Sequence, residues 1–311
     1  MSLSFATKYG INMRNAEFEE KDFEAPLYNQ LLFGSHNLAT PGQVFEGNFG
    51  IDAALQALHP LFWDLFGYPD IPPGVRLNDF RWRFVWRSLG RKRQLPNFSV
   101  NLLVQSKRPA VLQRARGALS HLGIRGPFWR FKIREHQQSI LEGIARTLGN
   151  KALVIYASPA FDTFDELYQY TQNRSIVEKT NYVKVTRMIG HLQWNYNFPG
   201  TNGVALSEAE PIEDDQFDIM LEELSRRYDL QAESTRELTL LYKSTISLCE
   251  EISNRNPVAR YILARHQMLL ETFNQMDLHI PTVIPFSGLL LIFSVVNLAW
   301  FIVGNTGEQA N

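Results

Sequence analysis

Two strand-like apolar runs constrain the fold of this chain most strongly. The first covers residues 100–104, and the second lies within "KALVIYASPAF", residues 151–161. Short runs rich in leucine and β-branched residues are typical of strands that are buried on both faces. Between them, "EHQQSILEGIARTLGN", residues 135–150, has the apolar spacing of an amphipathic helix and ends in a Gly-Asn stop signal. Strand, helix and strand in this order predict an α/β sheet with a crossover connection.

The rest of the chain divides into two predicted domains. We expect an N-terminal domain, residues 1–204, that carries an insertion at about 56–97, and an α-helical C-terminal module, residues 205–311. Further elements are expected as helices at 26–33, 109–123, 213–229, 232–254 and 257–276, and as a hairpin at 190–200. The hairpin, "GHLQWNYNFPG", is expected to pack its aromatic residues into the core, with stacking on bases as the alternative.

The last predicted element is an uncharged apolar segment of 21 residues, 283–303. Its length and hydropathy fit either a membrane anchor or a buried or oligomer-forming helix. Asn297 in its middle and Pro285 near its start favour the helix. We therefore expect the C-terminal module to end in a strongly apolar helix and to mediate homo-oligomerisation or the binding of a partner protein.

The composition indicates a globular intracellular protein. Of 311 residues, 45% are hydrophobic and 20% are charged, which is usual for a folded domain. The single cysteine, Cys249, excludes a disulfide framework or a cysteine-ligated zinc site within the chain. The N-terminus lacks the apolar core of a signal peptide. We expect a cytoplasmic location, with membrane association through residues 283–303 as the alternative.

The net charge of −1 conceals a strong segregation of charge along the chain. Residues 81–134 contain 14 Lys or Arg and no Asp or Glu, whereas residues 205–252 contain 13 acidic and 4 basic residues. If folding keeps these stretches together, one region carries a strong positive potential that suits a polyanionic partner. If folding scatters them, the segregation has no functional meaning.

Four residues supply the groups that hydrolysis of a phosphodiester needs. Such a reaction uses a divalent ion, carboxylates that hold it, and a cation near the attacking water. Asp52 lies in "GIDAAL", and Glu46 precedes this segment. Gln105 and Lys107 are two residues apart where a predicted strand ends. Side chains two apart on a strand face the same side, so Gln105 can approach a metal while Lys107 approaches the water or the phosphate. Oxygen ligands of this kind favour Mg²⁺ (or Mn²⁺).

The segments "GIDAAL" and "NLLVQSKRP" together resemble the PD-(D/E)xK nuclease superfamily, in particular its Mrr-like branch with a Q-x-K motif. The resemblance covers about residues 40–160. It implies a restriction-endonuclease-like mixed sheet flanked by helices, and magnesium-dependent cleavage of DNA in restriction or anti-phage defence. It also implies that Asp52 is the central metal ligand, Lys107 the catalytic lysine, Gln105 the variant of the usual acidic ligand, and Glu46 the helix-borne acid.

Other residues are expected to assist at this site. Gln137 and Gln138 lie where some branches carry a glutamine on the following helix, and they either orient a water or phosphate or simply face solvent. A basic insertion beside the active site suits a DNA clamp. The basic residues expected to contact DNA are Arg81, Arg83, Arg87, Arg91, Lys92, Arg93 and Arg108.

Two further functions are compatible with the sequence. A non-catalytic nucleic-acid-binding protein would keep the nuclease-like sheet, with Gln105 marking the loss of an acidic ligand. A membrane-tethered effector would use residues 283–303 to anchor the nuclease at a bilayer.

Overall fold

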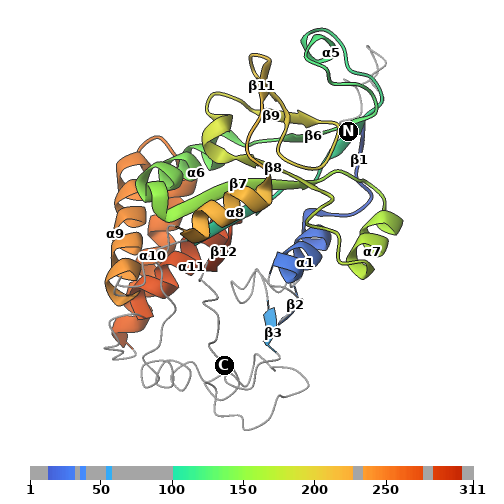
Figure 1. Ribbon diagram of the computed structural model, residues 1–311. Coiled ribbons are helices and arrows are strands. Elements are labelled where there is room, and N and C mark those ends of the chain that lie inside the picture. Colours follow the sequence, from blue (N-terminus) through green and yellow to red (C-terminus); the bar gives the residue numbers. More distant parts are fainter. Residues whose placement is uncertain are drawn as a thin grey trace, which may run out of the picture.

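The computed structural model describes residues 13–31, 36–39, 54–57, 101–226, 234–275 and 283–302. Within these ranges the chain is a mixed α/β structure, in which helices cover a four-stranded sheet and a six-stranded sheet lies beside it (Figure 1). A separate strand pair is formed by β2 (His36–Ala39) and β3 (Ala54–Ala57). The predicted α/β class is therefore confirmed.

The four-stranded sheet contains both apolar runs. Its order is β12 (Ala299–Ile302), β4 (Asn101–Ser106), β7 (Ala152–Pro159) and β8 (Thr180–Lys184). β4 and β7 are parallel, and the other two pairs are antiparallel. A parallel pair requires a crossover connection, so this prediction is confirmed as well.

Helices cover both faces of this sheet. Leu103 packs into one hydrophobic cluster, whereas Leu102 and Val104 pack into another, because successive side chains of a strand point to opposite faces. The first cluster includes residues of α6 (Glu135–Leu148), α9 (Ser234–Ile252), α10 (Pro257–Gln275) and α11 (Val283–Val295). The second includes residues of α1 (Glu20–Leu31), α7 (Phe164–Gln172) and α8 (Phe217–Arg226). In Figure 1, α9, α10 and α11 lie together at the left, and α1 and α7 lie at the right.

The six-stranded sheet is antiparallel throughout. Its order is β1 (Met13–Asn15), β5 (Ala110–Leu112), β6 (Phe128–Lys132), β9 (Gln193–Tyr196), β10 (Gly203–Leu206) and β11 (Glu210–Ile212). β9 and β10 form a hairpin, of which the predicted segment 190–200 supplies only the first strand and part of the turn. Trp194 and Tyr196 are buried as expected, whereas Phe198 is 75% exposed. Residues 107–109 connect β4 to β5 and so join the two sheets.

The predicted helix at 109–123 is wrong. This segment forms β5, which pairs with β1 and β6, followed by the short helix α5 (Ala118–His121). Gly117 has a φ of 57° just before α5, a conformation that glycine adopts readily and that breaks a continuous helix. The apolar residues Val111 and Leu112 are buried by strand pairing, which local sequence periodicity does not reveal.

The predicted apolar helix at the C-terminal end is also corrected. Residues 283–302 form α11, a turn, and strand β12, which pairs with β4. Asn297 has a φ of 58°, and asparagine is among the few residues that tolerate this left-handed conformation at the end of a helix. Among the described residues, no helix has both the length and the apolar character that crossing a bilayer requires.

The predicted domain boundary near residue 205 falls within β10. β10 pairs with β9 on one side and β11 on the other, so the six-stranded sheet continues across this position. β12 likewise returns to the four-stranded sheet from the C-terminal part of the chain. The helices α8, α9 and α10 confirm the helical stretches expected after residue 205.

Candidate functional site

A pocket of about 590 Å³ lies where β4 leaves one sheet and the chain turns into β5 of the other. One wall is formed by Glu20 of α1 together with residues 294–297 of the α11–β12 turn, and the other by β5 and β6. The pocket is strongly cationic. Among the described residues that line it, one is acidic, Glu20, and five are basic: Lys107, Arg108, Arg130, Lys132 and Arg134.

Lys107 is the most deeply buried cation of this pocket. Its exposed fraction is 8%, and its Nζ lies 5.6 Å from the centroid of the Tyr156 ring. Burial lowers the pKa of Lys107 below its ordinary value; Glu20 acts against this shift and Arg134 adds to it. An amine with a lowered pKa can change its protonation state more readily than a solvated lysine, which is a property of catalytic lysines.

Gln137 and Gln105 connect Lys107 to the C-terminal turn. Lys107 Nζ donates to Gln137 Oε1 over 3.3 Å, and Gln137 Nε2 donates to the carbonyl of Val296 over 2.7 Å. The same carbonyl accepts from Gln105 Nε2 over 2.6 Å. Gln105 and Lys107 are therefore both connected to the carbonyl of Val296, Gln105 directly and Lys107 through Gln137. Gln105 Oε1 is buried and has no hydrogen-bond partner within the described part of the chain.

The next residue of the turn, Asn297, holds the acidic side of the pocket. Its Nδ2 donates to Glu20 Oε1 over 3.0 Å and to Glu24 Oε1 over 3.5 Å, and Lys21 Nζ donates to its Oδ1 over 3.4 Å. Two consecutive residues thus contact both halves of the site: Val296 binds the glutamines and Asn297 binds the carboxylates. The left-handed backbone at Asn297 allows this arrangement.

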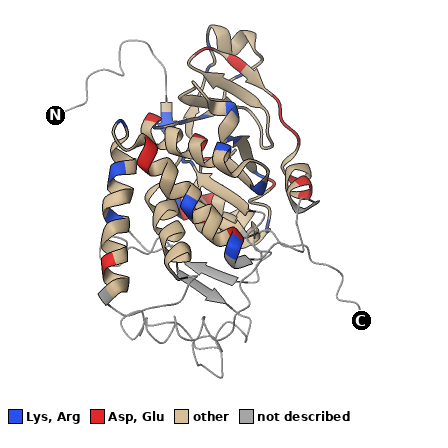
Figure 2. Ribbon diagram, turned by 90° about the vertical axis from the view of Figure 1, so that its left-hand side faces the viewer, with Lys and Arg blue, Asp and Glu red and all other residues tan. Residues whose placement is uncertain are grey.

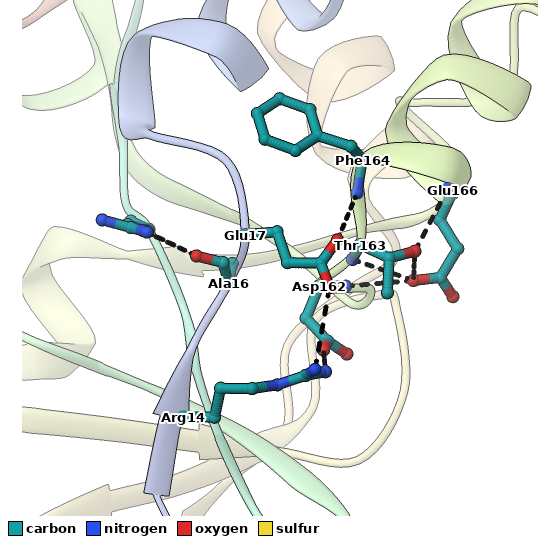
Figure 3. A network of polar contacts seen from close by, with 8 residues as sticks. Arg14, Ala16, Glu17, Asp162, Thr163, Phe164 and Glu166 are labelled. Atoms are coloured by element: carbon teal, nitrogen blue, oxygen red, sulfur yellow. Dashed lines mark hydrogen bonds and ion pairs between the residues drawn. The ribbon is translucent and has the colours of Figure 1, made fainter.

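A polar network fixes the segment that leads into α1 and so positions Glu20 (Figure 3). Arg14 forms an ion pair with Asp162, and Glu17 accepts a hydrogen bond of 3.1 Å from the backbone N–H of Phe164. Thr163 and Glu166 form a capping box at the start of α7, which holds the partner segment rigid. The segment that precedes α1 is therefore attached to the loop after β7 and to the first residues of α7.

Arg108 belongs to the same anchoring system. Its guanidinium donates to the carbonyl of Ala16 and pairs with Glu19 over 2.6 Å, while its backbone N–H donates to Glu20 Oε2 over 3.4 Å. The expected contact of Arg108 with DNA stays a prediction, and these bonds give Arg108 a structural role as well. It fastens residues 16–20 to the end of β4.

The opposite wall presents basic side chains from β6. Arg130 and Lys132 are two residues apart on this strand and both line the pocket. Arg130 Nε donates to Asn195 Oδ1 over 2.6 Å, and the buried Asn195 donates in turn to the carbonyl of Val204 over 2.9 Å. Burial lowers the pKa of Arg130. A guanidinium held in this way is pre-oriented for an anion.

Gln138 does not belong to the site. Its Oε1 accepts from the hydroxyl of Tyr156, and its Nε2 donates to Glu142 and to the carbonyl of Val185. It is 4% exposed. Gln138 therefore satisfies polar groups in the core, and the expectation that it orients a water or phosphate is wrong.

The remaining predicted site residues lie outside the described residues. These are Glu46, Asp52, Arg81, Arg83, Arg87, Arg91, Lys92 and Arg93, and most of the predicted insertion at 56–97. Conversely, sequence reasoning missed Glu20, Glu24 and Asn297. The signal for the first two was present, because acids four apart lie on the same face of a helix. The predicted helix began too late, at residue 26, to include them.

Glu20 is the one carboxylate among the described residues that line the pocket, and Gln105 is fully buried and does not line it. The described residues contain no group of three or more His, Cys, Asp or Glu side chains that could hold a metal. Magnesium, however, is commonly held by one or two carboxylates together with waters. Glu20 lines the pocket, and Gln105 Oε1 is a buried oxygen without a described partner.

Two acids in the described part of the acidic stretch have basic partners nearby. In the view of Figure 2, basic and acidic residues lie on neighbouring elements. Asp214 pairs with Lys184 over 2.9 Å and with Arg187 over 3.5 Å, and Glu210 contacts His191 over 3.1 Å. Asp214 is therefore paired with two cations of the same region. The described part of the basic stretch, by contrast, contributes all five basic residues of the pocket.

Comparisons with protein-family models, with curated proteins and with solved structures found no match.

Proposed function

We propose that this chain is a magnesium-dependent nuclease that hydrolyses phosphodiester bonds in DNA. The observation that carries the proposal is the position of Lys107, buried in a pocket with five basic residues and the carboxylate of Glu20. A phosphodiester is an anion that such a pocket attracts, and its hydrolysis needs the groups that surround Lys107.

Each described residue then has a separate role. Arg130 and Lys132 bind the phosphate from the side of β6. Lys107 lies near the attacking water and neutralises charge that develops on the phosphate, with Gln137 holding its amine in place through the 3.3 Å hydrogen bond. Glu20 would hold the metal together with Gln105 and Asp52. Magnesium, when bound, would polarise the phosphate and lower the pKa of a bound water.

A second candidate function is nucleic-acid binding without catalysis. Gln105 favours it, because the amide takes the place of a carboxylate and its Nε2 donates to Val296 rather than remaining available to a substrate. This function predicts binding that weakens steeply with salt and needs no magnesium.

Cleavage assays on the full chain test the proposal. Wild type is expected to cut DNA with magnesium and not with EDTA, and Lys107→Ala and Asp52→Ala are expected to abolish cutting. Lys151→Ala is the matched control, because Lys151 is exposed and pairs with Glu237 away from the pocket. If the wild type cuts no nucleic acid but binds it with a steep dependence on salt, the second function replaces the first.

A further inference from the structure

We infer that the pocket admits a single nucleotide unit of single-stranded DNA, whose phosphate is held between Lys107 and the pair Arg130 and Lys132. The inference rests on the proposed function in one respect, namely that the reacting phosphate lies beside Lys107. It adds a substrate class, single-stranded rather than duplex DNA, and two residues that select it.

The depth of Lys107 supports this restriction. Only 8% of its side chain is exposed, so a phosphate has to enter the pocket to approach Nζ. A volume of about 590 Å³ lies within the range of sites for small ligands, roughly 300–1,000 Å³. A nucleotide fits a space of this volume, and we expect the backbone of an intact duplex to stay outside it. A base in a duplex would first have to unpair and leave the stack. This unpairing costs free energy, and a single strand has no base pair to break.

The shape of the pocket follows from the register of the six-stranded sheet. Asn15, Ala110, Arg130 and Asn195 are direct neighbours across β1, β5, β6 and β9. Asn15, Ala110 and Arg130 all line the pocket, and the small Ala110 lies in register between the two longer side chains.

The two walls differ in charge, and this orients a bound nucleotide. Arg130 and Lys132 come from β6, while Glu20 and Asn297 face them from α1 and the α11–β12 turn. An anionic phosphate is attracted to the first wall and repelled by the carboxylate of the second. Arg130 is held by Asn195, so it loses little conformational entropy when it binds an anion.

Measuring DNA binding in the absence of metal tests this inference independently of cleavage. The full chain is titrated in EDTA with a fluorescein-labelled oligonucleotide, either single-stranded or annealed to its complement, and fluorescence anisotropy is measured. Unlabelled deoxyadenosine monophosphate is then added as a competitor. We expect the single strand to bind at least about tenfold more tightly than the duplex, and the mononucleotide to displace it.

Three variants identify the residues. Lys132→Ala removes a charge from an exposed side chain, and Arg130→Lys keeps the charge but loses the guanidinium held by Asn195. Both are expected to weaken binding of the single strand, and Lys132→Ala is expected to reduce the slope of log affinity against log salt by about one. Arg125→Ala is the matched control, because Arg125 belongs to the same basic stretch but does not line the pocket.

Any one of three results would overturn the inference. The duplex and the single strand bind with equal affinity, the mononucleotide does not displace the single strand, or Arg130→Lys and Lys132→Ala weaken binding no more than Arg125→Ala does. If the single strand binds as described but is never cut, the nuclease function fails and the pocket assignment stands. If duplex DNA is cut and Arg130→Lys and Lys132→Ala cut it as the wild type does, the pocket assignment fails and the nuclease function stands.

Discussion

Lys107 donates a hydrogen bond of 3.3 Å to Gln137, and this contact attaches the buried amine to α6. Gln137 Nε2 in turn donates a hydrogen bond of 2.7 Å to the carbonyl of Val296, a residue 159 positions further along the chain. The site is thus assembled from the end of β4, the first turn of α6, and the turn between α11 and β12. Each of the following predictions tests one part of this arrangement.

Gln137 and Gln138 are expected to separate activity from stability. Gln138→Ala leaves the buried hydroxyl of Tyr156 and the carbonyl of Val185 without their partner, so the free energy of unfolding should fall by about 1–3 kcal/mol. Gln137→Ala should lower it less and reduce DNA cleavage, because the half-buried Gln137 positions Lys107. Denaturant unfolding and cleavage rates measure the two effects. The reverse order of stabilities would contradict the assignment of Gln138 to the core.

Asn297 is expected to stabilise the turn in two ways that can be measured separately. Asn297→Ala loses the hydrogen bonds to Glu20 and Glu24 and places alanine at a φ of 58°, so we expect a loss of about 2 kcal/mol or more. Asn297→Gly loses only the hydrogen bonds, because glycine adopts this conformation freely, and should lose less. Urea unfolding of both variants checks this. Equal losses would show that the backbone conformation contributes nothing.

His266 is expected to make stability depend on pH. Burial lowers the pKa of His266 below its ordinary value of 6.5, although Glu250 acts against this, and Tyr242 shares a hydrogen bond with its Nε2. The unfolded chain therefore binds this proton more readily, and the free energy of unfolding should fall as the pH decreases from about 6.5. Thermal unfolding of His266→Gln should show a weaker dependence in this range. His121→Gln, at an exposed position, is the control and should behave as the wild type.

Glu20 and Glu46 compete for the role of the helix-borne acid. The structure brings Glu20 to the pocket of Lys107, so Glu20→Gln should reduce magnesium-dependent cleavage by at least about 100-fold, since even the partners of metal ligands contribute about 10–100-fold. Glu46→Gln should have a smaller effect. Glu251→Gln is the control, because Glu251 is exposed on α9 and does not line the pocket. A larger loss in Glu46→Gln than in Glu20→Gln would restore the role that the resemblance implies.

The elements predicted correctly are those whose signal is local. β4, α6, β7 and the helices after residue 205 show periodicity over consecutive residues, and the structure has them at nearly the predicted positions. β5 and β12 were missed because a short strand is stabilised by partners elsewhere in the chain. β12 pairs with β4 across a separation of about two hundred residues, and an apolar run alone does not show whether it continues as a helix.

In the candidate site, too, contacts between residues close in sequence were easier to predict than contacts between distant ones. The two-residue spacing of Gln105 and Lys107 predicted that their side chains face the same side, and both are connected to the carbonyl of Val296, Gln105 directly and Lys107 through Gln137. Their expected roles toward a metal and a phosphate stay predictions. The contact between Asn297 and Glu20, by contrast, spans 277 positions. No local pattern distinguishes Asn297 from other asparagines, so its role becomes visible only when α11 and β12 are placed against α1.

The most direct test of the account is the rate at which the full chain cleaves single-stranded DNA with magnesium, compared between wild type, Lys107→Ala and Lys151→Ala. The account predicts that wild type and Lys151→Ala cut at similar rates, that Lys107→Ala does not cut, and that all three unfold at similar denaturant concentrations. Cleavage by Lys107→Ala at the wild-type rate would contradict it, because the buried amine would then have no part in the reaction.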